Sequence, residues 1–270
     1  MSNLLGQYES VIRISVFAGV LILMISAETL FPKKQRVQKR MQRWSTNLSL
    51  TLISTLLVSR LFPIAAIGLA QYAQDQHWGV LNIFDLPIWA HILISIIALD
   101  FAIYVQHVAS HKFPIFWRLH KVHHADRDID ATTGIRFHPV EIILSLFYKF
   151  AVICVLGPHM FGVFMFEILL NASALFNHAN LSLPKSVDKI LRVLIVTPDM
   201  HRVHHSVIPK ETNSNYGFNL SIWDKIFRTY IEQPSQNHDK MIIGLTQYQS
   251  PKPSFILWCL ALPFKKNKQG

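Results

Sequence analysis

Histidines at short, regular spacings are the residues of this sequence best suited to chemistry. Eight of the fourteen histidines fall in two stretches, residues 107–124 and 199–206. They are His107, His111, His120, His123, His124, His201, His204 and His205. On a helix, spacings of three and four residues place side chains on one face. Neutral imidazole binds zinc, copper, iron and nickel, and eight rings exceed what one ion can use. The sequence therefore predicts a site for two metal ions.

A polar face runs along the segment that carries the first histidine pair. Asp100, Tyr104, His107 and His111 follow the period of an α-helix. A carboxylate inside an apolar helix needs a partner. We expect Asp100 to accept an imidazole N–H and so fix the orientation of a metal ligand. The alternative is a bond from Asp100 to a neighbouring helix that serves packing alone.

Five apolar stretches are expected to position these histidines. They cover residues 11–31, 47–73, 87–105, 140–156 and 161–176, which as helices match or approach the thickness of a bilayer. Arg60 and Pro63 interrupt the second stretch and predict a kink or two unequal helices. A shorter run, 254–264, is expected to lie in the membrane interface. The predicted fold is an all-α integral membrane protein of four to five transmembrane helices, with a cytoplasmic helical cap that carries the histidines.

Basic residues orient these spans. Residues 33–43 include six Lys or Arg, whereas residues 71–86 include none. By the positive-inside rule the first segment is cytoplasmic. This places the N-terminus outside, and the histidines and the C-terminus on the cytoplasmic side of a bacterial inner membrane or of the endoplasmic reticulum.

The composition excludes several other classes of protein. Only 16% of residues are charged and 51% are apolar, whereas soluble domains carry about 25% charged residues. The net charge of +10 comes from basic residues beside apolar spans, which suits anionic lipids better than nucleic acid. Two cysteines, Cys154 and Cys259, are too few for an iron–sulfur cluster or a thiolate zinc site. The HExxH motif of soluble zinc proteases is absent from the sequence.

Five ordered segments within residues 99–230 read DFAIYVQHVASH, WRLHKVHH, RFHPVE, FNHANL and TPDMHRVHHS, the last followed by NYGFNLSIWDKIFRTY. This ordered set resembles the fatty acid hydroxylase/sterol desaturase superfamily, the membrane di-iron oxygenases. The resemblance implies nine metal ligands, namely His178 and the eight histidines above. In some hydroxylases of this superfamily the third motif is a second HxxxH, but Ser182 occupies the second position here. Either one metal ion then keeps an open coordination position, or His138 supplies the tenth ligand. If His138 is not a ligand, we expect it to lie behind the ligands or to face the substrate.

The resemblance also implies an activity. In proteins of this type two iron ions, for which zinc can substitute, activate dioxygen to hydroxylate a C–H bond of a lipid. The two electrons would come from an external ferredoxin, cytochrome b5-like protein or flavin reductase, because the sequence has no GxGxxG or haem-binding HPGG motif. A lipid or sterol desaturase of the same superfamily and a non-catalytic zinc-binding membrane scaffold remain alternatives. The oligomeric state stays open.

The remaining expectations concern boundaries and supporting residues. Residues 1–98 are expected to form N-terminal helices and a basic loop, 99–232 a catalytic domain, and 233–270 an interfacial tail. Glu141, which follows a proline at a helix start, either caps that helix or accepts a hydrogen bond from a ligand histidine. Histidines outside the motifs are expected to be structural or solvent-facing. These histidines are His77, His91, His159 and His238. A set of polar and aromatic residues between 215 and 224 is expected to form a tight turn followed by a short helix.

Overall fold

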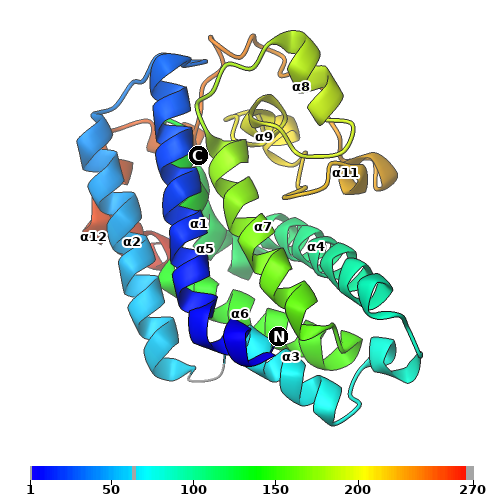
Figure 1. The fold of residues 1–270 in the computed structure, drawn as a ribbon. Helices are drawn as coiled ribbons and strands as arrows, with labels where there is room; N and C mark the ends of the chain where they lie inside the picture. The colour runs from blue at the N-terminus through cyan, green and yellow to red at the C-terminus, as the bar shows by residue number, and fades with distance from the viewer. Residues whose placement is uncertain (1, 63–64, 266–270) are drawn as a thin grey trace.

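Apolar helices long enough to cross a bilayer dominate the structure (Figure 1). The computed structural model describes residues 2–62 and 65–265. Five of its stretches qualify as membrane spans by length and composition: Tyr8–Leu30, Arg40–Ile83, Ile88–Lys112, Pro139–Leu156 and Met160–His178. Over the described ranges the only β-type pairing is three isolated bridges. The predicted all-α membrane class is confirmed.

Six longer helices build the bundle. A seventh, which carries the first HxxHH motif, joins most of the shorter helices in a cap at the histidine end, while the helix nearest the C-terminus packs on the bundle. The longer helices are α1 (Ser2–Leu30), α2 (Arg40–Leu61), α3 (Ala66–Asp75), α4 (Ile88–Lys112), α5 (Pro114–His124), α6 (Pro139–Leu156) and α7 (Met160–His178). The shorter ones are α8 (Lys185–Leu191), α9 (Pro198–His204), α10 (Pro209–Thr212), α11 (Ile222–Ile226) and α12 (Ile256–Ala261). Single 3-10 turns are η1 (Val80–Ile83), η2 (Ala131–Ile135), η3 (Thr246–Tyr248), η4 (Lys252–Ser254) and η5 (Leu262–Phe264).

The second predicted span is a pair of unequal helices. Helix α2 ends at Leu61 and α3 begins at Ala66, while Pro63 itself lies outside the described residues. The run at residues 254–264 is too short to span a bilayer; it forms η4, α12 and η5, which pack on α2 and α5. Its expected place in the membrane interface stays a prediction.

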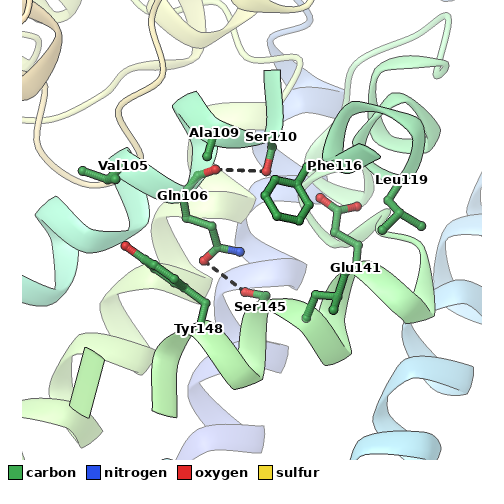
Figure 2. A pocket seen from close by; sticks show the side chains of 10 residues that line it. Val105, Gln106, Ala109, Ser110, Phe116, Leu119, Glu141, Ser145 and Tyr148 are labelled. Atoms are coloured by element: carbon green, nitrogen blue, oxygen red, sulfur yellow. Dashed lines mark hydrogen bonds between the residues drawn. The ribbon is translucent and has the colours of Figure 1, made fainter. Parts of the chain in front are cut away.

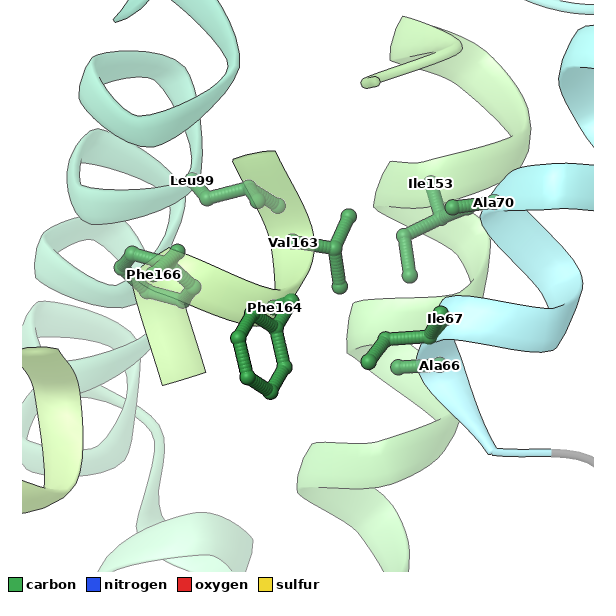
Figure 3. Packing of buried hydrophobic residues seen from close by; sticks show 8 residues of the cluster. All are labelled: Ala66, Ile67, Ala70, Leu99, Ile153, Val163, Phe164 and Phe166. Atoms are coloured by element: carbon green, nitrogen blue, oxygen red, sulfur yellow. The ribbon is translucent and has the colours of Figure 1, made fainter. Parts of the chain in front are cut away.

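Helix α7 lies in the middle of the bundle, in contact with α1, α3 and α4 (Figure 1). A buried cluster at the end of the bundle away from the cap joins α3, α4, α6 and α7, and includes Ile67, Leu99, Ile153 and Phe166 (Figure 3). Gly162 allows α7 to approach α4 closely, because a Cβ there would lie 2.7 Å from Cβ of Ser95. Small residues at such contacts are typical of helices packed in a membrane.

The loop that follows α5 is held by a buried arginine. Arg43 of α2 is fully buried; its Nε donates to Asp126 Oδ1 at 2.7 Å and its other guanidinium nitrogens reach Asp126 and Asp130. Breaking such a pair leaves an uncompensated buried charge, which costs about 3–5 kcal/mol. Part of the basic segment 33–43 therefore stabilises the fold, because Arg36 and Arg40 also lie next to buried Glu28.

The histidine ends of the spans meet at one end of the bundle. Glu28, near the end of α1, accepts backbone N–H bonds from Ala131 of η2 and from Asn180, just beyond α7. At the other end, Gln74 of α3 accepts from the backbone N–H of Met160, the first residue of α7. In Figure 1 the N-terminus lies at this second end, and α8, α9 and α11 gather at the first.

Candidate metal centre

Nine histidines gather into two adjoining groups. The five-histidine group contains His107, His111, His120, His124 and His204, and the four-histidine group contains His123, His178, His201 and His205. Within each group one ligand nitrogen per residue lies within 4.8 Å of the others. Rings of the two groups are in contact, with 4.6 Å between the ring centroids of His124 and His205. All nine are histidines that the sequence singled out, and their role as metal ligands stays a prediction.

Each HxxHH motif serves both groups. Successive residues of a helix point about 100° apart, so the adjacent His123 and His124 of α5 face different groups. Helix α9 repeats this, because His204 joins the five-histidine group while His201 and His205 join the other. The two groups are thereby built side by side from the same short helices. The sequence predicted the helical faces but not this division.

Hydrogen bonds fix the orientation of five rings. The Nδ1 atoms lie near one oxygen each: Tyr216 O for His107 (2.8 Å), Glu141 Oε1 for His120 (2.6 Å), Arg136 O for His123 (3.3 Å), Ala174 O for His178 (2.7 Å) and Ser214 O for His204 (2.7 Å). A carbonyl oxygen only accepts, so in the four carbonyl cases the proton is on Nδ1 and Nε2 carries a lone pair. An oxygen partner behind the ring is typical of metal-binding histidines.

The Nε2 atoms that result suit a cation. His178 Nε2 lies 3.1 Å from His123 Nε2 and 3.0 Å from His201 Nε2. Because His178 and His123 both hold their protons on Nδ1, two lone pairs face each other at that distance. In the five-histidine group, Nε2 of His107, His120 and His204 is buried without a hydrogen-bond partner among the described residues. These orphaned nitrogens fit metal ions held between the rings.

The environment keeps the imidazoles of the cap neutral. Burial, with the neighbouring imidazoles adding to it, lowers the pKa of His204 to about 3. The same causes lower the pKa of His123, His124, His201 and His205 well below the ordinary value. Neutral imidazole is the form that binds metals. At physiological pH a metal ion therefore has no proton to displace from these rings.

Glu141 and His138 have different roles at the start of α6. The hydrogen bond expected between Glu141 and a motif histidine is present, with His120 Nδ1 donating to Oε1. His138 belongs to neither histidine group. Its Nδ1 accepts from the Val140 N–H, and its Nε2 lies 3.2 Å from the carbonyl of Leu260. It caps α6, and both ring nitrogens are bonded away from the two histidine groups, so these contacts support neither a tenth ligand nor a position directly behind a ligand at His138. A contact between His138 and a substrate stays a prediction.

The expected partner of Asp100 was wrong. Its carboxylate accepts from the backbone N–H groups of Asn219 and Leu220 and from Trp223 Nε1, the last at 2.8 Å. The N–H of His107 goes instead to the carbonyl of Tyr216. Asp100 thus anchors a loop that itself orients a histidine. No pattern in the sequence marks a backbone carbonyl as the acceptor.

A glycine gives η2 close access to α7 behind His178. A Cβ on Gly134 would lie 2.4 Å from the carbonyl oxygen of Ala174 and 3.3 Å from His178 Nδ1. That carbonyl is the one that accepts from His178. Only glycine fits this contact without displacing the ring or its acceptor.

The other expected structural residues are as predicted. His91 Nε2 lies 3.0 Å from the Gly157 carbonyl, and His159 caps α7 by accepting from the Phe161 N–H. His77 is exposed at a turn, and His238 is buried with its Nε2 3.8 Å from Asp199. The set at residues 215–224 forms the expected turn, with Asp224 accepting from the backbone N–H groups of residues 216 and 217 before the short α11.

A mostly apolar cavity of about 170 Å³ lies beside the histidines, between α4, α5 and α6 (Figure 2). Glu141 lines it and links it to His120. The exposed side chains of Val105, Phe116 and Leu144 also line it, and α4 and α6 are both membrane spans by length and composition. The cavity thus opens at a surface formed in part by two of the candidate membrane spans.

Comparison with known proteins agrees with this geometry. The model of the family described as fatty acid hydroxylase matches residues 92–229, just over half of the chain. The chain is 25% identical over 241 residues to an ornithine lipid hydroxylase, OlsE, of Rhizobium tropici, which covers 86% of this chain and 70% of that protein. It is 28% identical to an alkylglycerol monooxygenase of Xenopus tropicalis, covering 74% of this chain and 43% of that protein. It is 29% identical to methylsterol monooxygenase 2-2 of Arabidopsis thaliana, covering 60% of this chain and 61% of that protein.

The chain spans less than half the length of the alkylglycerol monooxygenases it matches. No solved structure matches it. The fold and the site define a helical membrane protein with two adjoining histidine groups suited to metal ions. The chain belongs to the fatty acid hydroxylase family.

Proposed function

We propose that this chain is a membrane-bound di-iron oxygenase that hydroxylates a C–H bond of a lipid. The overall reaction consumes the lipid, one dioxygen, two electrons and two protons, and yields the alcohol and water. The observation that carries the proposal is the pair of adjoining histidine groups with nitrogen lone pairs facing each other. The similarity to enzymes named as lipid hydroxylases and monooxygenases supports it.

The chain's own residues would hold the ions and exclude water. The proposed ligands are the nine histidines of the two groups, with one iron in each group. Iron so held would supply the binding and reduction of dioxygen, and zinc would substitute for it without redox chemistry. Eight of the nine rings are buried, which keeps the neutral imidazoles away from water. The carbonyls behind His107, His123, His178 and His204 hold those rings in place.

The lipid would enter from the membrane, and the electrons from outside the chain. A ferredoxin, a cytochrome b5-like protein or a flavin reductase is the proposed donor; nucleic acid is not a proposed partner. We propose residues 99–232 as the catalytic part. Two buried contacts connect this part to the rest of the chain: Arg43 pairs with Asp126, and Arg136 donates to the Pro253 carbonyl. The catalytic part and the segments before and after it would therefore fold together.

The proposed topology has the N-terminus outside and the histidines in the cytoplasm, in a bacterial inner membrane or the endoplasmic reticulum. It follows from the basic segment 33–43 at the histidine end of the bundle. Single-cysteine variants at the exposed Gln76 and Lys210 test it with a membrane-impermeant thiol reagent. Labelling of intact cells or spheroplasts is expected at residue 76 alone, and labelling at residue 210 alone would reverse the orientation.

Metal content and product mass test the activity. His204→Ala and His123→Ala each remove one ring from a different group, so each variant is expected to lose iron and to lose at least about 10³-fold in turnover. Membrane insertion should persist. His77→Ala, exposed and remote, is the matched control and should retain both iron and turnover.

Products are read by mass spectrometry with dioxygen and a reductase system. A gain of one oxygen atom supports hydroxylation, and a loss of two hydrogens would indicate a desaturase. If the purified protein contains zinc, and still consumes no dioxygen after the zinc has been exchanged for iron, the result would indicate a structural scaffold. Unchanged turnover in both histidine variants would contradict the assignment.

A further inference from the structure

The cavity beside the histidines has a shape and a polar end that restrict what can occupy it. Its volume is about 170 Å³, and an apolar cavity of about 150 Å³ holds one benzene ring. A rigid four-ring sterol nucleus is larger than one such ring and would not be enclosed whole, whereas a short stretch of flexible chain fits. The opening at the surface formed in part by two candidate membrane spans would let the rest of a lipid stay among the membrane lipids.

Among the polar side chains that line the cavity, Ser110, Ser145 and Tyr148 use their hydroxyls in hydrogen bonds within the chain, whereas Gln106 and Glu141 each keep one group free for a ligand. Gln106 Oε1 accepts from Ser145 Oγ at 3.3 Å, which leaves the amide nitrogen turned into the cavity (Figure 2). Glu141 uses Oε1 for His120, while Oε2 is buried and has no hydrogen-bond partner among the described residues. One group donates a hydrogen bond and the other accepts one. A buried acceptor without a partner is costly, so a ligand that donates to Glu141 would relieve that cost.

We infer that this cavity binds a straight alkyl or acyl chain that carries a hydroxyl or an amide group, which accepts from Gln106 and donates to Glu141. A hydroxyl and an amide can each accept and donate a hydrogen bond at once, whereas an ester or ether oxygen can only accept. The inference rests on the proposed function and adds the substrate class. Glu141 would then contact the lipid and His120 at the same time.

Photo-crosslinking tests the site without turnover. The probe is 1-hexadecanol with a diazirine in its chain, applied to the full metal-loaded chain in nanodiscs without reductant. Cross-links should map to residues of α4 and α6 that line the cavity. Leu144→Trp narrows the cavity and should lower the yield at least about fivefold. Val155→Trp, on the lipid-exposed face of the same helix, is the matched control and should leave the yield unchanged.

Competition by unlabelled compounds tests the polar end. In the wild-type chain 1-hexadecanol should compete best, methyl hexadecanoate about fivefold less well and hexadecane least, and cholesterol should not compete. Glu141→Gln keeps an acceptor for His120 but replaces Oε2 by a donor, so the advantage of the alcohol over the ester should vanish while most of the metal content is kept. Gln106→Met should weaken alcohol and ester alike.

Effective competition by cholesterol would overturn the chain-like substrate class, and an unchanged ranking in both polar variants would overturn the roles of Gln106 and Glu141. Cross-links spread evenly over the lipid-facing helices would overturn the site itself. A chain that cross-links as expected but oxidises no lipid would overturn the proposed function alone. A chain that oxidises a lipid but cross-links elsewhere would overturn this inference alone.

Discussion

At the scale of single residues, the metal centre depends on atoms behind the imidazoles as much as on the imidazoles. Four rings are oriented by backbone carbonyls, which no side-chain substitution removes directly. His120 is different, because its acceptor is the Glu141 carboxylate. This makes Glu141 the one position, among those with a described acceptor, where ring orientation can be tested by a simple substitution.

Glu141→Ala is expected to weaken metal binding by about 10–100-fold. The reason is that the His120 N–H loses its acceptor and the ring can rotate away from the five-histidine group. Glu141→Gln, which retains an acceptor oxygen, should lose much less. Chelator competition, read as the midpoint of metal release, measures this without turnover. Equal midpoints for the alanine variant and the wild type would show that the carboxylate does not hold the ring.

At the scale of elements, short segments of the cap are held by the transmembrane helices. Asp100 in α4 accepts two hydrogen bonds from the loop before α11 and a third from Trp223 of α11. Tyr216, whose carbonyl orients His107, lies in the same loop. Phe227, just beyond α11, also stacks on Phe101 and Tyr104 of α4. The helix thus positions its own histidine partly through a loop more than a hundred residues later.

Asp100→Ala is expected to loosen this loop. Two backbone N–H groups and the Trp223 indole lose their acceptor, so residues 216–223 should exchange amide hydrogen at least about tenfold faster. Hydrogen–deuterium exchange with mass spectrometry measures it. Asp85→Ala, in the exposed segment before α4, is the matched control. Unchanged exchange at residues 216–223 would mean that the aromatic stack alone holds the loop.

At the scale of the whole molecule, burying so many imidazoles makes the metal-free protein sensitive to acid. The pKa of His204 is about 3 in the folded state against 6.5 as the ordinary value. Between these values the unfolded chain binds a proton that the folded chain does not, so stability rises with pH through this range and falls on acidification.

From pH 7 to pH 5, His204 alone should cost about 2 kcal/mol of folding stability in the metal-free chain. The other cap histidines have pKa values shifted in the same direction and add to this. A fall in Tm of at least about 5 °C is expected. Thermal unfolding in detergent with and without chelator measures it, and the metal-loaded chain should shift less. A Tm that is flat from pH 7 to pH 5 without metal would contradict neutral, buried imidazoles.

The sequence was most informative where structure is periodic. The five apolar stretches and the histidine spacings follow from helical period and bilayer thickness, so the bundle and eight of the nine clustered rings could be predicted. His178 followed only from the resemblance to a known family. The partners of Asp100 and of His138 Nε2 could not, because they belong to segments more than a hundred residues away that come together only in the folded chain. The division into groups of five and four also depends on how α5 and α9 are placed relative to α4 and α7.

Gly134 occupies a position that tolerates no side chain. It has no functional group, yet any larger residue there would push against the Ala174 carbonyl that steadies His178. An allele that introduces even a methyl group at this position would therefore imitate the loss of the proposed ligand His178 while every imidazole remains encoded. A survey of inactive variants that inspects only histidines would miss it.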